Sequence, residues 1–331
     1  MKLAIIGGGS WGTALAVVLA PRFDQVWLWM YERDLAERMV HSRENDVFLP
    51  GFLVPENVTV GCDLAASADG CAMLLGVMPS RHARRLYQQL LPLLDPSTIL
   101  ISATKGIEHD SLLRMSEVIR DVLRPRFEPK VAVLSGPTFA REVARGDPTA
   151  VVVASTDDET ARLVQAACAG NNFRLYTNSD PAGVEFGGAL KNVIAIGAGI
   201  CQGLGLGSNS QAALVTRGLT EITRLAVAAG GQARTLAGLA GLGDLVLTCG
   251  GALSRNRKVG MELADGKSLA EITGSMRMVA EGVETCDAAV ALGAKFGVDL
   301  PIMEQMHAVL HAEKTPHAAL RELMERSLKS E

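Results

Sequence analysis

Lys191 lies on the apolar face of a predicted helix. Around it the stretch 184–195 reads VEFGGALKNVIA, and the residues three, four and seven positions away, which share its helical face, are apolar or glycine. A lysine in this setting either extends its ammonium group to solvent or lies partly desolvated beside a ligand, where its pKa falls toward neutrality and it can exchange protons. Gly187 and Gly188 favour the second interpretation, because they leave space for a substrate one turn away.

Asp244 is the one charged residue of the segment 238–248, GLAGLGDLVLT, which is too apolar to be an ordinary solvated loop. A carboxylate in such a segment needs a partner. As a helix N-cap its role would be structural. Beside Lys191 it would instead orient the ammonium group and accept a hydrogen bond from a substrate hydroxyl. The sequence leaves both roles open.

A further polar cluster begins a predicted helix at 253–260, LSRNRKVG. Ser254 is the expected cap, and Arg255 and Asn256 follow it with two more cations. Cations at the N-terminus of a helix oppose its dipole, so their placement indicates an anion such as phosphate at the helix end. For the two cations after Asn256, a solvated basic turn is the alternative.

Lys105 belongs to the segment 102–106, SATKG, which comes just after a predicted strand. The carboxyl ends of strands in open α/β sheets are where such folds bind ligands. Lys105 is therefore a candidate ligand-binding residue, and a surface lysine in a turn is an equally good interpretation of the residues alone.

The motif Gly7-x-Gly9-x-x-Gly12 follows the predicted strand 2–6 and opens the predicted helix 11–20, which is the setting of a dinucleotide-binding loop. In such a loop the first glycine permits the tight turn. The second lets the backbone approach a pyrophosphate, and the third allows close packing of helix on strand. The N–H groups at the helix start then bind the phosphates. The motif predicts NAD or NADP as the cofactor.

Residues 30–34, MYERD, end the second predicted strand, about 20 residues after the last glycine, where the adenosine ribose is expected. Glu32 could accept hydrogen bonds from the ribose diol and favour NAD. Arg33 could pair with a 2′-phosphate and favour NADP. Both could also lie on a solvated loop. These residues alone do not decide between the two cofactors.

Two other chemistries find little support in the sequence. His307 and His311 are one helical turn apart, but no third ligand follows nearby, so we predict no metal site. No serine, histidine and aspartate are arranged around a nucleophile turn, which argues against hydrolysis.

The candidate residues require two different frameworks. In the first half, strand-like runs alternate with helical patterns, at residues 2–6, 26–30, 72–77, 99–102, 131–134 and 150–154. This alternation indicates an α/β fold with a Rossmann-like, doubly wound parallel sheet. After Asn178, Asp180-Pro181 is a helix-start signal and long helical segments follow. We expect a dinucleotide-binding domain at 1–178 and an all-α substrate-binding domain at 179–331.

Composition points to a small-molecule partner. The 331 residues suffice for two cores, and the formal charge of −4 comes with dispersed basic residues, which argues against a nucleic-acid surface or a polybasic membrane patch. The six cysteines lack the paired spacing of a zinc site or redox dithiol. No leader-like or membrane-spanning pattern opens the sequence, so we expect a cytoplasmic protein without membrane insertion.

Motifs along nearly the whole chain resemble those of the bacterial NAD(P)-dependent glycerol-3-phosphate dehydrogenases. In the first half these are GGGSWGTALA from Gly7, Pro79-Ser80, Thr104-Lys105-Gly106, and SGPTFA from Ser135 with Glu142-Val143. In the second half they are Gly183-Val184-Glu185, GALKNV from Gly188, Thr216-Arg217-Gly218, the segment 238–249, LSRN from Leu253, and Glu281-Gly282-Val283.

The resemblance implies an enzyme that interconverts dihydroxyacetone phosphate and sn-glycerol 3-phosphate with NAD(P)H, supplies the backbone for phospholipid synthesis, and forms a homodimer. Lys191 is the implied proton donor and acceptor, with Lys105 and Asp244 completing the polar set around the carbonyl. The implied substrate contacts are Lys105, Gly136, Thr138, Lys191, Asn192, Asp244, Ser254, Arg255 and Asn256. The implied cofactor contacts are Gly7, Gly9, Ser10, Trp11, Gly12, Glu32, Arg33, Lys105, Ala140, Arg255, Val279 and Glu281.

The chain departs from the family pattern in two loops. Gln202-Gly203 stands where many relatives have Asp-Gly, and Ser210-Gln211 replaces the usual Ala-Arg after Asn209. Relatives often carry a basic residue earlier in the segment 31–34, which favours NAD for this chain.

Two other functions explain part of the sequence. A dehydrogenase for hydroxy acids or hydroxyacyl thioesters would not account for the anion site at Ser254, Arg255 and Asn256. A non-catalytic nucleotide sensor would keep the glycine loop but would have no use for Lys191 on an apolar face.

Overall fold

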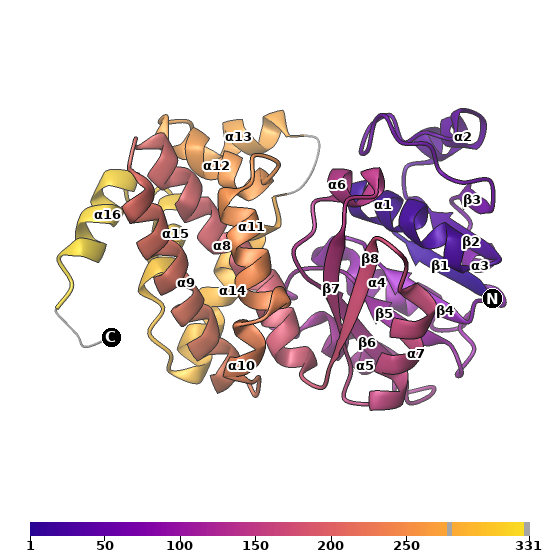
Figure 1. Ribbon diagram of the computed structural model, residues 1–331. Coiled ribbons are helices and arrows are strands. Elements are labelled where there is room, and N and C mark those ends of the chain that lie inside the picture. Colours follow the sequence, from indigo (N-terminus) through magenta and orange to yellow (C-terminus); the bar gives the residue numbers. More distant parts are fainter. Residues whose placement is uncertain (277–279, 328–331) are drawn as a thin grey trace. The chain divides into compact units, whose positions relative to one another are not determined.

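The computed structural model of the chain describes residues 1–276 and 280–327 (Figure 1). The chain divides into two compact units, and each is described by itself. The first comprises Met1–Glu108 and Leu113–Glu185, and the second comprises His109–Leu112 and Phe186–Glu331. This division falls inside a helix that begins at Pro181, whereas the sequence-based boundary comes after Asn178.

The first unit is built on a sheet that has eight strands among the described residues, in the order β3-β2-β1-β4-β5-β6-β7-β8. Neighbouring strands from β3 to β6 are parallel, so their carboxyl ends meet at one edge. The predicted Rossmann-like fold is confirmed. The strands are β1 (Lys2–Ile6), β2 (Gln25–Trp29), β3 (Val58–Gly61), β4 (Met73–Gly76), β5 (Ile99–Ser102), β6 (Lys130–Ser135), β7 (Thr149–Ala154) and β8 (Phe173–Asn178).

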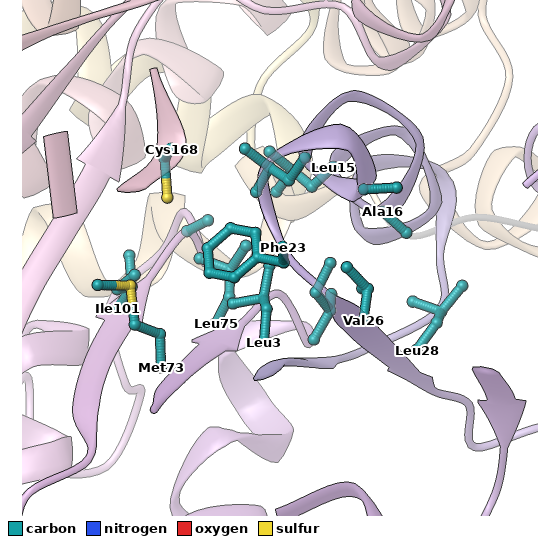
Figure 2. Close-up of a cluster of buried hydrophobic side chains, with 14 of the residues drawn as sticks. Leu3, Leu15, Ala16, Phe23, Val26, Leu28, Met73, Leu75, Ile101 and Cys168 are labelled. Carbon is teal, nitrogen blue, oxygen red and sulfur yellow. The ribbon is translucent and has the colours of Figure 1, made fainter. Parts of the chain in front are cut away.

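Core clusters that include helix residues lie on both faces of this sheet, which is why its central strands β1, β4 and β5 read as continuous apolar runs. Successive residues of a strand point to opposite faces. Leu3 and Ile5 of β1 therefore join one core cluster, drawn in part in Figure 2, while Ala4 and Ile6 join a second cluster on the other face. The helices of this unit are α1 (Ser10–Leu19), η1 (Ala20–Arg22), α2 (Arg33–Ser42), α3 (Leu64–Ala68), α4 (Ser80–Leu90), α5 (Met115–Leu123), α6 (Ala140–Arg145) and α7 (Asp158–Cys168).

The last two strands differ from the expected parallel arrangement. β7 runs antiparallel to β6, and β8 pairs with β7 in parallel. A parallel connection needs a crossover helix that carries the chain back along the sheet. The only helix between β6 and β7 is α6, whose six residues span about 9 Å at 1.5 Å per residue, too little to carry the chain back beside a six-residue strand.

A buried ion pair fixes the start of α5 in the first unit. Glu185 accepts hydrogen bonds from the Arg114 guanidinium (2.7 Å), from the Ser116 hydroxyl (2.6 Å) and from the Ser116 backbone N–H (2.7 Å). The side chain of Glu185 is 4% exposed and that of Arg114 is 14% exposed. Burial raises the pKa of Glu185, and the Arg114 charge opposes that shift.

The second unit consists of helices among its described residues (Figure 1). Its central helix, α8 (Pro181–Gly203), begins as predicted, with Pro181 in its first turn and the Asp180 carboxylate accepting a hydrogen bond from the Gly183 N–H (2.9 Å). In the described chain, α8 is the one helix long and apolar enough to cross a membrane, and its apolar window is wholly buried in the protein. The other helices are α9 (Ser208–Ala228), α10 (Ala233–Leu236), the π-helical turn η2 (Leu239–Gly243), α11 (Asp244–Gly250), α12 (Arg255–Ala264), α13 (Leu269–Ser275), α14 (Glu281–Phe296), α15 (Pro301–Leu310) and α16 (Pro316–Met324).

Glu221 joins α9 to the start of α15. Its carboxylate accepts hydrogen bonds from the backbone N–H groups of Ile302 (2.8 Å) and Met303 (3.2 Å), which have no partner within their own helix. Burial raises the pKa of Glu221 to about 7, because the loss of solvent disfavours the charged form more than the two N–H groups favour it.

Candidate active site

The glycine loop between β1 and α1 has the geometry that a dinucleotide requires. Gly7 has a φ of +123°, which L side chains rarely adopt, and a Cβ there would lie 2.8 Å from the backbone of Val77. A Cβ on Gly12 would clash with the Gly7 carbonyl oxygen. A Cβ on Gly9, the N-cap residue of α1, would meet open space. The N-terminus of α1 is therefore open to a phosphate group.

The same loop is held by a buried amide that the sequence interpretation missed. The Asn45 Nδ2 group donates to the Gly8 carbonyl (2.9 Å) and to the Thr13 hydroxyl (2.8 Å), and Asn45 is completely buried. The Ser10 hydroxyl donates to the Phe48 carbonyl (2.6 Å). An isolated asparagine more than thirty residues from the loop carries no motif, so only its burial in the fold reveals this positioning role.

Other predicted residues of the first unit meet at the carboxyl edge of its parallel strands. Lys105 follows β5 and Gly136 follows β6, next to the edge where Gly7 follows β1. The Lys105 ammonium donates to the Gly136 carbonyl (3.2 Å), and the Thr138 hydroxyl donates to the same oxygen (3.2 Å). Because β1 and β4 stand where the strand order reverses, this edge is the ligand-binding crevice of such folds.

Glu32 and Arg33 occupy the expected place at the end of β2. Ile6 pairs with Trp29 in the parallel register, so the carboxyl ends of β1 and β2 lie side by side. Glu32 caps α2 through its backbone without a side-chain hydrogen bond, and Glu32 and Arg33 are both exposed. Either side chain is accessible to a ribose.

The remaining predicted cofactor residues lie in several elements. Trp11 is in the first turn of α1 with its indole Nε1 buried and without a hydrogen-bond partner, and Ala140 is the first residue of α6. Glu281 is the first residue of α14. Val279 lies outside the described residues.

In the second unit, the structure brings Lys191 and Asp244 together. The Lys191 ammonium forms a salt bridge with the Asp244 carboxylate and donates a hydrogen bond to the Thr248 hydroxyl (2.9 Å). Lys191 is 5% exposed and Asp244 is completely buried. The Thr248 hydroxyl also donates to the Asp244 carbonyl (2.7 Å). Lys191 is thus held by two oxygen acceptors and does not extend into solvent.

Thr248 was not singled out from the sequence. It lies four residues after Asp244 on α11, so the two share one helical face, and this spacing within an otherwise apolar segment was the available signal.

Gly187 has a different role from the one expected. A Cβ on Gly187 would lie 2.5 Å from the Ala240 carbonyl oxygen and 3.2 Å from the Gly241 Cα. The backbone of η2, rather than a substrate, therefore fills the space beside Gly187. η2 leads directly into α11. Because η2 lies close to α8, Asp244, the first residue of α11, is within reach of Lys191.

The start of α12 combines a cap, an exposed cation and a buried amide pair. Ser254 accepts a hydrogen bond from the Arg257 N–H (3.3 Å) as the N-cap, and Arg255 is exposed in the first turn. Asn256 donates to the Asn192 side-chain oxygen (3.0 Å) and accepts from the Gly282 N–H (3.0 Å). Asn192 follows Lys191 on α8, so the amide pair connects the predicted phosphate end to the predicted proton donor.

The donor set fits a dinucleotide in the first unit and acid–base chemistry in the second. The α1 terminus offers N–H groups to a pyrophosphate next to the open face of Gly9. Lys191 has the chemistry of a general acid, because its ammonium carries a proton and Asp244 fixes its direction.

Comparison with known proteins shows that the sequence is similar to one family of enzymes along most of its length. Residues 2–161 match the sequence profile described as NAD-dependent glycerol-3-phosphate dehydrogenase N-terminus, and residues 180–321 match the profile of its C-terminus. The chain is 57% identical to a glycerol-3-phosphate dehydrogenase (NAD(P)+) of Koribacter versatilis, over 98% of this chain and 97% of the relative. It is 53% identical to that of Citrifermentans bemidjiense, over 100% and 98%.

A solved structure agrees with this similarity. The crystal structure of glycerol-3-phosphate dehydrogenase from Coxiella burnetii superposes with a TM-score of 0.93 at 42% identity, covering 98% of this chain and 99% of that one.

Proposed function

The chain belongs to the NAD-dependent glycerol-3-phosphate dehydrogenase family, and on that premise we propose which of its residues bind and which react. It is an oxidoreductase that interconverts dihydroxyacetone phosphate and sn-glycerol 3-phosphate with NAD or NADP. The observation that supports our assignment of roles is the buried Lys191–Asp244–Thr248 network.

We assign the dinucleotide to the first unit. The glycine loop and the start of α1 bind the pyrophosphate, and Asn45 holds the loop in its bound shape. Glu32 accepts hydrogen bonds from the adenosine ribose, which makes NAD the preferred form over NADP. When bound, the nicotinamide ring supplies the hydride that reduces the substrate ketone.

Lys191 supplies the proton. As the ketone is reduced, the Lys191 ammonium donates a proton to the carbonyl oxygen, and in the reverse direction the amine takes it back. Asp244 and Thr248 keep the ammonium pointed in one direction, so little reorganisation is needed when negative charge develops on the oxygen. The family resemblance adds Lys105 of the first unit as a further proposed substrate contact.

The phosphate of the substrate binds at the start of α12. Arg255 is exposed in the first turn, where the N–H groups and the helix dipole also favour an anion. Asn256 and Asn192 position this helix end relative to Lys191. A phosphate held there orients the substrate and places its ketone for reaction.

Replacing Arg255 by alanine should raise KM for dihydroxyacetone phosphate by about 10–100-fold, the equivalent of one charge-assisted hydrogen bond to phosphate. The value of kcat should change little, because the phosphate is remote from the reacting carbon. Steady-state kinetics with both substrates varied measure the effect. Arg321→Ala, on the exposed side of α16, is the matched control and should leave KM unchanged. A rise confined to the KM of the cofactor would show that the phosphate site is misplaced.

We further propose that the enzyme is a homodimer in the cytoplasm and supplies the glycerophosphate backbone for phospholipids. The dispersed charge supports a protein that binds neither nucleic acid nor membrane.

A further inference from the structure

Asp287, His307 and His311 form a cluster in the second unit, separate from the groups assigned to the reaction. Asp287 belongs to α14, His307 to the last turn of α15, and His311 caps the C-terminus of α15. The Asp287 Oδ1 atom lies 2.8 Å from His311 Nε2 and 3.4 Å from His307 Nε2. The three potential ligand atoms lie within 4.8 Å of one another. Two imidazole nitrogens and one carboxylate oxygen therefore lie close enough together to bind one ion.

These distances suit a small metal ion. Bonds of about 2.0–2.2 Å from a tetrahedral Zn²⁺ to nitrogen and oxygen place neighbouring ligand atoms roughly 3.4 Å apart. The Asp287–His307 distance already has this value, and the Asp287–His311 hydrogen bond needs to open by about 0.6 Å. The cluster is partly exposed, with side chains 30%, 30% and 46% accessible, so such a rearrangement requires no repacking of the core.

The surrounding helices fix the cluster and favour a cation. The His311 N–H donates to the His307 carbonyl (3.0 Å), which holds the two residues together at the C-terminal end of α15. On α14, Cys286 precedes Asp287 and is completely buried. Its thiol lies 3.6 Å from the Met303 carbonyl of α15, so the two helices are in contact next to the cluster. The C-terminus of a helix carries a partial negative charge, which adds to that of Asp287.

We propose that Asp287, His307 and His311 form a binding site for one divalent transition-metal ion of the Zn²⁺ class, which links α14 to α15. Imidazole nitrogens select such ions over Mg²⁺ and Ca²⁺, which prefer oxygen ligands. Water completes the coordination, because the cluster supplies three ligands and faces solvent. The ion stabilises the helical unit and takes no part in the reaction, since none of its ligands belongs to the proposed active site. The third ligand comes from a different helix, which explains why the sequence analysis predicted no metal.

Isothermal titration of the whole protein with Zn²⁺ tests the site. The wild type should bind one ion per chain that His307→Ala, His311→Ala and Asp287→Asn lose or bind at least about tenfold more weakly, since even residues that only support metal ligands contribute 10–100-fold to affinity. His317→Ala, which removes an exposed histidine from the next helix, is the matched control and should titrate like the wild type. Mg²⁺ should not compete.

Two further readouts separate metal binding from other effects. Zn²⁺ should raise the unfolding temperature of the wild type and of His317→Ala but not of His311→Ala, because the ion stabilises only a folded state that binds it. The metal-free variants should reduce dihydroxyacetone phosphate at the wild-type kcat. Absence of Zn²⁺ binding by the wild type, or equal titration of the wild type and all three ligand variants, would overturn the proposal.

Discussion

Lys191→Met should lower kcat for dihydroxyacetone phosphate by about 10² to 10⁴-fold, the loss expected when a general acid is removed. Methionine keeps the length of the side chain but has no proton to donate to the carbonyl oxygen. Cofactor binding should be unchanged, because the glycine loop belongs to the first unit and Lys191 to the second. Stopped-flow or steady-state oxidation of the nicotinamide measures kcat, and a fluorescence titration with NADH measures binding.

The variant leaves the Asp244 carboxylate buried without its cation, so loss of folding must be distinguished from loss of chemistry. The double variant Lys191→Met with Asp244→Asn removes both charges and should fold while remaining as slow as the single variant. Lys267→Met, on an exposed salt bridge of the same unit, is the matched control and should keep full activity. Wild-type turnover by a folded Lys191→Met protein would exclude Lys191 as the proton donor.

Glu185→Ala should lower the free energy of unfolding of the first unit by about 3–5 kcal/mol, the usual cost of removing one partner of a buried ion pair. The Arg114 guanidinium would lose its buried carboxylate, keeping the more exposed Glu117. The Ser116 N–H at the start of α5 would lose its acceptor as well. Burial raises the pKa of Glu185, because the charged carboxylate is costly to bury. Removing the carboxylate costs more free energy, because Arg114 and the Ser116 N–H then lose a buried acceptor.

Urea unfolding followed by tryptophan fluorescence measures this loss, since the three tryptophans, Trp11, Trp27 and Trp29, all belong to the first unit. Arg124→Ala breaks the exposed Arg124–Glu128 pair, whose side chains are 61% and 66% accessible, and should cost about 0–1 kcal/mol. Equal effects of the two substitutions would contradict the importance of the buried pair.

The elements that position the cofactor could be predicted because their signals are local. The strand at Lys2–Ile6 and the helix start at Asp180-Pro181 depend on neighbouring residues, and the structure has both. β3 and β8 were missed because they are short or mixed in polarity; β8 alternates buried and exposed residues before ending in polar ones. The antiparallel direction of β7 follows from the short helix α6 that precedes it. The apolar runs in the sequence did not show the length of that helix.

The proposed active site was predictable where a single residue was out of place in its surroundings. Lys191 has no polar residue on its helical face and Asp244 is the one charged residue of its segment. A buried charge needs a partner, so their pairing was one of the two roles that the sequence left open for Asp244. Asn45 and the third residue of the metal cluster, Asp287, could not be found this way, because their significance comes from neighbours distant in sequence. The role of Gly187 was misjudged because the sequence shows that a glycine leaves space beside the helix, but does not show whether a ligand or another segment of backbone fills that space.

The most direct test of the proposed function is the oxidation of NADH and NADPH by the purified protein with dihydroxyacetone phosphate, with unphosphorylated dihydroxyacetone as the control. We expect turnover that requires the phosphate and is faster with NADH, because in the proposed site Arg255 and the start of α12 bind the phosphate and Glu32 accepts hydrogen bonds from the ribose diol. No turnover of dihydroxyacetone phosphate with either cofactor, or equal turnover of both ketones, would contradict the proposed site.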